Sequence, residues 1–134
     1  MPRQLILHIG LPKTGSSAIQ FFLNARRKEL LRHGVYCPPT PGGANHSALS
    51  LAVEVRNQPR QWANEVKLKG LAAPVRIEDF WRQFEADMKS VPPEAGTVIL
   101  SAERFGAQLD TPDKIAYLHG VLAPYFGSMR VGIV

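Results

Sequence analysis

The stretch that most constrains the fold is Gln4–Gln20, which reads QLILHIGLPKTGSSAIQ. It begins with a short apolar run, turns through Gly10 and Gly15, and continues with two serines and a helical pattern. A strand, a glycine loop and a helix in this order can bind a phosphate through backbone N–H groups and the positive end of the helix dipole. The stretch therefore predicts an α/β fold with an anion site after its first strand.

The two glycines have the spacing of the nucleotide-binding P-loop, G-x-x-x-x-G-K-[ST], but one position departs from it. The residue after Gly15 is Ser16, where the P-loop has lysine. Ser17 keeps the hydroxyl position, and a lysine occurs earlier, at Lys13. An ATPase also needs an acidic residue after a neighbouring strand to help hold magnesium, and the next clear strand, Thr97–Leu100, is not followed by aspartate. Both departures argue against ordinary ATP or GTP hydrolysis.

The segment LPKTGSS, Leu11 to Ser17, directly follows the strand-like LILHIG and resembles the 5′-phosphosulfate-binding loop of sulfotransferases. These enzymes use 3′-phosphoadenosine 5′-phosphosulfate (PAPS) as donor. The form HIGLPKTGSSAIQ is most similar to bacterial sulfotransferase-like proteins related to carbohydrate sulfotransferases. A weaker second match covers Ser101 to Phe105. The alternative interpretation is a relic of a P-loop or another anion-binding turn.

The resemblance implies that the loop binds the donor. The implied donor-binding residues are Pro12, Lys13, Thr14, Gly15, Ser16 and Ser17. A sulfuryl group carries less charge than a phosphoryl group, so magnesium is dispensable and no metal is expected. Lys13 would stabilise charge that develops on the leaving phosphate; the alternative is a solvated loop lysine.

Two residues are candidates for the general base. Ligands of open α/β sheets bind beyond the carboxyl ends of the strands, and Ser101, Glu103 and Arg104 follow a predicted buried strand. On the resemblance to carbohydrate sulfotransferases, Glu103 would take the proton from an acceptor hydroxyl. A structural ion pair is the alternative role for Glu103. His46, after a linker rich in proline and glycine, is the second candidate, with an exposed residue beside a helix cap as its alternative.

Composition and length indicate one globular domain. The chain has 134 residues, 45% hydrophobic and 20% charged, which favours a single domain over 1–134 with a real core. No apolar run approaches the roughly 20 residues of a membrane span, and the N-terminus does not read as a secretory signal. A cytoplasmic location is expected, and the single cysteine, Cys37, is expected to be a buried structural thiol.

The net charge of +5 suits an anionic nucleotide and an acceptor such as a polysaccharide. It would also suit a nucleic acid. The sequence lacks the interleaved basic and aromatic residues of known nucleic-acid modules, so this partner is a minor alternative. The sequence leaves open whether the chain forms a homo-oligomer.

Periodic patterns predict the remaining elements. Strands are expected at 4–9, 35–37, 97–100 and 129–134, and helices at 16–32, 47–56, 77–90 and from Thr111 onward. Residues 58–75 are expected to form a mobile, substrate-facing loop with a helical turn near Trp62. Phe22 and Leu23 in the first helix, and Ile115 and Leu118 in the last, are expected to face the sheet.

These elements predict a three-layer α/β/α sandwich with a P-loop-like parallel sheet. The sequence stops within the last predicted strand, so the expectation is an N-terminal portion whose activity needs the C-terminal part of the fold. The favoured function is sulfuryl transfer from PAPS to an acceptor hydroxyl, with a carbohydrate as candidate acceptor. The alternatives are a non-catalytic nucleotide- or anion-binding module and, less favoured, a P-loop kinase of small molecules.

Overall fold

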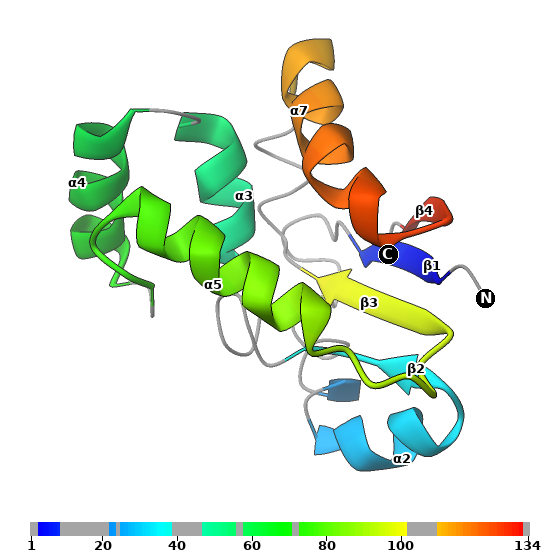
Figure 1. Cartoon of the computed structure of the whole chain (residues 1–134). Coiled ribbons are helices and arrows are strands. Elements are labelled where there is room, and N and C mark those ends of the chain that lie inside the picture. The colour runs from blue at the N-terminus through cyan, green and yellow to red at the C-terminus, as the bar shows by residue number, and fades with distance from the viewer. Residues whose placement is uncertain are drawn as a thin grey trace.

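The chain forms an α/β structure around one parallel sheet (Figure 1). The computed structural model describes residues 3–8, 22–23, 25–38, 47–55, 58–70, 73–101 and 110–132. The strands are β1 (Gln4–His8), β2 (Val35–Tyr36), β3 (Thr97–Ser101) and β4 (Ser128–Gly132). Their order is β2-β3-β1-β4, and every neighbouring pair is parallel. The predicted α/β class and the parallel pairing of the three longer strands are confirmed.

The register of the three longer strands aligns their ends. Gln4 pairs with Thr97 on one side and Ser128 on the other. His8, at the opposite end of β1, pairs with Ser101 and with Gly132. The carboxyl ends of β1, β3 and β4 therefore stop at the same edge of the sheet.

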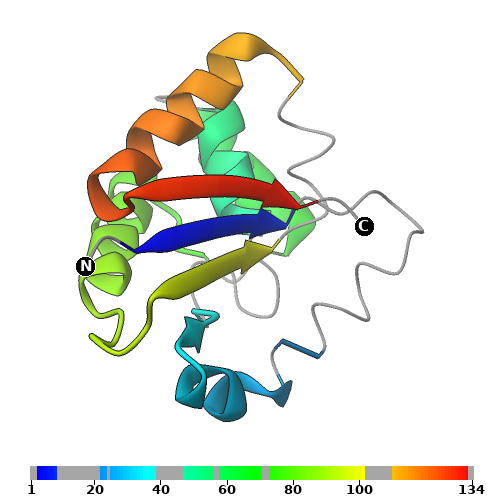
Figure 2. The same ribbon diagram turned by 90° about the vertical axis from the view of Figure 1, so that its right-hand side faces the viewer.

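Helices cover one face of this sheet. The helices are α2 (Arg27–Arg32), α3 (Ser47–Val55), α4 (Pro59–Lys69), α5 (Ile77–Lys89), α7 (Pro112–Leu122) and the 3-10 turn η1 (Ala123–Tyr125). Figures 1 and 2 show α3, α5 and α7 on the same side of the strands, whereas α2 lies beside β2. Among the described elements no helix covers the opposite face of β1 and β3, so the predicted third layer stays a prediction.

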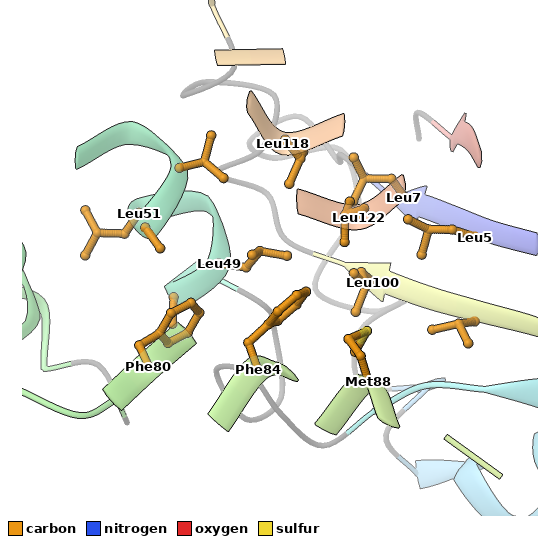
Figure 3. Close-up of a cluster of buried hydrophobic side chains, with 14 of the residues drawn as sticks. Leu5, Leu7, Leu49, Leu51, Phe80, Phe84, Met88, Leu100, Leu118 and Leu122 are labelled. Atoms are coloured by element: carbon orange, nitrogen blue, oxygen red, sulfur yellow. The ribbon is translucent and has the colours of Figure 1, made fainter. Parts of the chain in front are cut away.

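The core lies between the sheet and these helices. Alternate strand residues point toward them, including Leu5 of β1 and Leu100 of β3, both fully buried. Phe80, Phe84 and Met88 of α5 pack against this surface (Figure 3). Their spacing of four residues places them on one side of a helix. The predicted amphipathic helix at 77–90 is confirmed.

The predicted loop at 58–75 is wrong over most of its length, because residues 59–69 form helix α4. Pro59 occupies its first turn, where the missing N–H costs nothing, and Gly70 ends it in the left-handed conformation. Trp62 is completely buried, and its Nε1–H donates to the Pro74 carbonyl oxygen at 3.0 Å. The Trp62 and Phe80 ring centroids lie 5.1 Å apart. This segment is therefore part of the core and is not a substrate-facing loop.

Two residues expected to face the sheet are exposed. Phe22 is 55% exposed, whereas its neighbour Leu23 is buried, as expected. Ile115, in the first turn of α7, is 53% exposed. The later turns of α7 make the buried contacts, through Leu118 and Leu122. The expected start of this helix at Thr111 is confirmed, since its side chain accepts a hydrogen bond from the Lys114 backbone N–H.

Arg3 forms hydrogen bonds that link neighbouring segments at the amino edge of the sheet. Its Nε–H donates to the Ala95 carbonyl oxygen at 3.0 Å, and a terminal guanidinium nitrogen donates to the Pro92 carbonyl oxygen at 3.0 Å. The Arg3 carbonyl oxygen accepts from the Gly127 N–H at 2.8 Å. These contacts join the segments that enter β1, β3 and β4. The amino edge is therefore held together by structural contacts.

Within the ranges given above, no helix has both the length and the apolar character that crossing a membrane requires.

Gly34 is a position where a side chain is expected to cost stability. Its φ is +79°, and its N–H donates to the Leu31 carbonyl oxygen to end α2. An added Cβ would meet the Glu94 carbonyl oxygen at 3.5 Å, an ordinary contact, so the cost comes from the backbone conformation. We expect Gly34→Ala to lower the free energy of unfolding by about 1–2 kcal/mol.

Urea unfolding followed by circular dichroism measures this loss. Gly96→Ala is the matched control, because a Cβ there meets nothing within 4 Å and the φ of Gly96 is not positive. Gly34→Asn should lose less, since asparagine tolerates the left-handed region. If Gly34→Ala and Gly96→Ala were equally stable, the positive φ of Gly34 would not be the source of a stability cost.

Candidate functional site

The site is expected where β1 and β3 end. The two strands lie side by side, yet the connection after β1 leads to β2, on the far side of β3. The connection after β3 leads to β4, on the far side of β1. The two connections thus leave neighbouring strands in opposite directions across the sheet. In open α/β sheets a crevice forms at such a point, and ligands bind there.

The last residues of these two strands form a buried polar pair. His8 Nδ1 lies 2.6 Å from Ser101 Oγ, within hydrogen-bond distance. His8 is 6% exposed and Ser101 is 1% exposed. Either group can donate, depending on which imidazole nitrogen carries the proton. A direct side-chain bond therefore joins the two central strands at the carboxyl edge.

His8 is a site feature that sequence reasoning missed, although a signal was present. It is the one polar residue in the run LILHI, in a strand predicted to be apolar and buried. Polar groups that are buried in a sheet need a partner, and the parallel register supplies Ser101. The sequence alone does not show which strand lies beside β1, so this pairing had no basis before the fold was known.

The predicted donor-binding residues, Pro12 to Ser17, lie outside the described residues, as do Glu103 and His46. The structure describes what flanks them. His8 stands two positions before Gly10, and Ser101 stands two positions before Glu103. Because His8 and Ser101 are register partners, the loop and the glutamate start from adjacent points of the sheet. His46 directly precedes α3.

In the described segments, no group of three or more histidine, cysteine, aspartate or glutamate side chains could hold a metal ion.

The basic residues of α2 and its N-cap, Arg26, are of two kinds. Arg26 pairs with Glu29 at 2.9 Å, and Lys28 and Arg32 are exposed, as expected of a solvated face. Arg27 instead points inward: its Nε–H donates to the Cys37 carbonyl oxygen at 3.1 Å. Arg27 therefore has a structural contact, which fixes the segment that follows β2.

Cys37 is buried, as expected, and is not an activated nucleophile. Burial raises the pKa of its thiol above the ordinary value of 9.0, and the nearby Arg27 charge opposes this only in part. A thiolate is disfavoured in the folded chain. The position therefore has no sign of covalent catalysis.

The raised thiol pKa predicts a pH-dependent stability. In the unfolded chain Cys37 loses its proton near its ordinary value, whereas the folded chain retains it to higher pH. The native state therefore binds more protons in this window, and stability falls as pH rises above about 9. We expect the stability difference between the wild type and Cys37→Ala to narrow between pH 7.5 and pH 10.

Urea unfolding of both proteins at the two pH values checks this. Tyrosine and lysine titration affects the two proteins alike and cancels in the difference. A difference that stays constant, or widens in favour of the wild type at high pH, would contradict the raised pKa.

No protein-family model, curated protein or solved structure matches the chain. Inference about function therefore depends on the loop sequence and on the placement of the strands that flank it.

Proposed function

We propose that this chain provides the donor site of a PAPS-dependent sulfotransferase that acts on a hydroxyl group, with carbohydrate as the favoured acceptor class. The observation that carries the proposal is the pairing of His8 with Ser101. It supports a single site because neighbouring strands lie only about 4.8 Å apart. The loop from Gly10 to Ser17, called the Gly10 loop below, starts two residues after His8, and Glu103 comes two residues after Ser101.

The loop sequence favours sulfuryl over phosphoryl transfer. The G-x-x-x-x-G spacing retains a backbone cradle for the 5′-phosphate, and the lysine that follows the second glycine of kinases is replaced by Ser16. Lys13 is then the cation that the loop supplies. One lysine suits a transferred group of low charge, whereas phosphoryl transfer relies on a metal ion for the β- and γ-phosphates.

The proposed reaction is an in-line displacement at sulfur. The acceptor oxygen forms a bond to sulfur, and the bond between sulfur and the bridging oxygen breaks. The bridging electron pair passes to the 5′-phosphate, where Lys13 would neutralise the developing charge. Glu103 would accept the proton of the attacking hydroxyl, with His46 as the second candidate. The products are a sulfate ester and adenosine 3′,5′-bisphosphate.

The direct test, made on the full-length protein, is transfer of label from [35S]PAPS, in the presence of a chelator, to a neutral and a uronate-containing oligosaccharide. We expect labelled oligosaccharide and an equal amount of adenosine 3′,5′-bisphosphate. Lys89→Ala is the control variant. Lys89 is exposed and pairs with Glu85. It is the last residue of α5, and the segment after it leads to the amino end of β3. Binding of PAPS without transfer would instead support a non-catalytic binding module, and phosphate transfer from magnesium-ATP would support a kinase.

A further inference from the structure

We propose that the His8–Ser101 hydrogen bond is a positioning contact for the donor site. It holds the end of β1, from which the Gly10 loop leaves, against the end of β3. The inference rests on the proposed function and deepens it, because it assigns a role to two residues that belong neither to the loop nor to the candidate bases.

The pair occupies a distinct place on the sheet. Side chains alternate between the faces of a strand, so His8 and Ser101 share a face with the register pair Ile6 and Ile99. This is the face opposite to Leu7 and the helices α3, α5 and α7. On this face the apolar pair Ile6–Ile99 lies between two polar pairs, Gln4–Thr97 and His8–Ser101. Of these two polar pairs, only His8–Ser101, at the carboxyl ends of the strands, is buried.

Stability alone does not call for a polar pair at this position. A hydrogen bond contributes little net stability after desolvation, and replacing both partners with apolar groups of similar shape can be nearly neutral. A hydrogen bond adds direction, however, because it is satisfied in only a narrow range of geometries. The bond between His8 Nδ1 and Ser101 Oγ therefore favours one relative placement of the two strand ends.

That placement matters for an anion held by backbone N–H groups. Binding constellations must be held within roughly 0.5 Å of the productive geometry. His8 is separated from Gly10 by one residue in the sequence, so we expect the position of the strand end to affect where the loop begins. Without the bond, β1 and β3 keep their backbone pairing, but they lose the side-chain contact that fixes the last position of β1.

The test compares four variants with the wild type by calorimetric titration with adenosine 3′,5′-bisphosphate. The variants are Ser101→Ala, His8→Leu, the double variant, and Ser101→Thr, which retains the hydroxyl. We expect each of the first two to weaken binding by about tenfold, as the loss of an orienting contact does at bound-ion sites. The double variant should be no weaker than the single ones, and Ser101→Thr should lie within about twofold of the wild type.

Thermal midpoints and NMR separate positioning from general packing. Ser101→Ala leaves the buried His8 Nδ1 without its hydroxyl partner, so its midpoint should fall by several degrees. Binding is therefore measured at a temperature at which this variant is fully folded, and Ser101→Ala then decides the question even where His8→Leu does not fold. The His8 imidazole signals of the wild type should shift when adenosine 3′,5′-bisphosphate binds.

Three outcomes would overturn the inference. A wild type that does not bind the bisphosphate defeats the proposed function and this inference with it. Binding that is equal in wild type and Ser101→Ala defeats the inference alone. Losses of affinity that add in the double variant would show that the two residues act independently, as packing contacts and not as a positioning pair.

Discussion

Replacing Lys13 with alanine is expected to reduce sulfuryl transfer from PAPS by at least about 100-fold while the thermal midpoint stays unchanged. Loss of one group that stabilises charge developing in the transition state typically lowers kcat by roughly 100- to 1,000-fold. In the proposed reaction Lys13 is the loop's only cationic side chain between Gly10 and Ser17. No other residue of the loop could replace its charge.

The transfer rate from [35S]PAPS and the thermal midpoint measure the two halves of this prediction. Lys89→Ala, which removes an exposed lysine at the other edge of the sheet, should keep the wild-type rate. Lys13→Arg should recover part of the lost rate, because it restores the charge with a different shape. Wild-type turnover in Lys13→Ala would refute the assigned mechanism.

The largest expected effect on stability is that of Trp62→Ala. The side chain is completely buried, its ring contacts Phe80, and its Nε1–H satisfies the Pro74 carbonyl oxygen. Truncating it removes a large buried apolar surface and leaves a cavity. It also leaves the Pro74 carbonyl oxygen without its hydrogen-bond donor. We expect the free energy of unfolding to fall by about 3–5 kcal/mol, a large share of the stability of a domain of this size.

Urea unfolding followed by far-ultraviolet circular dichroism measures this loss, since the substitution removes one of the two tryptophan fluorophores. Leu68→Ala on the same helix is the matched control, because Leu68 is 80% exposed. The control should change stability by no more than about 0.5 kcal/mol. If Trp62→Ala were as stable as Leu68→Ala, α4 would not belong to the core.

Hydrophobic patterning predicted most of the sheet. The strands at 4–8 and 97–101 are short apolar runs bounded by turn residues, and their ends were placed within one residue. α5 was equally clear, because its buried residues recur at helical spacing. The order of the strands in the sheet was harder to predict, because β2 follows β1 in the sequence but pairs with β3. Such crossovers depend on tertiary packing and leave no local signal.

The α4 helix shows what the pattern does not capture. Among the side chains of α4 whose burial is described, Trp62 and Val66 are buried, and they form a narrow stripe among polar and charged neighbours. A stripe this narrow gives weak periodicity, although Pro59 and Gly70 were valid start and stop signals. Trp62 is completely buried, and its partners Phe80 and Pro74 come from later in the chain.

The candidate site was predictable in its location more than in its parts. The rule that ligands bind beyond the carboxyl ends of parallel strands led to Ser101 and the Gly10 loop. Adjacency of the two strands was a condition of that prediction, and the structure confirms it. The roles of Lys13, Glu103 and His46 remain predictions. His8 was missed because its importance depends on a partner 93 residues away.

Calorimetric titration with adenosine 3′,5′-bisphosphate, compared with ADP and with magnesium-ATP, tests the central claim most directly. We predict that the bisphosphate binds more tightly than either of the other nucleotides and that a chelator leaves its affinity unchanged. A clear preference for magnesium-ATP, or no binding of the bisphosphate, would contradict a PAPS site at the carboxyl edge of β1 and β3.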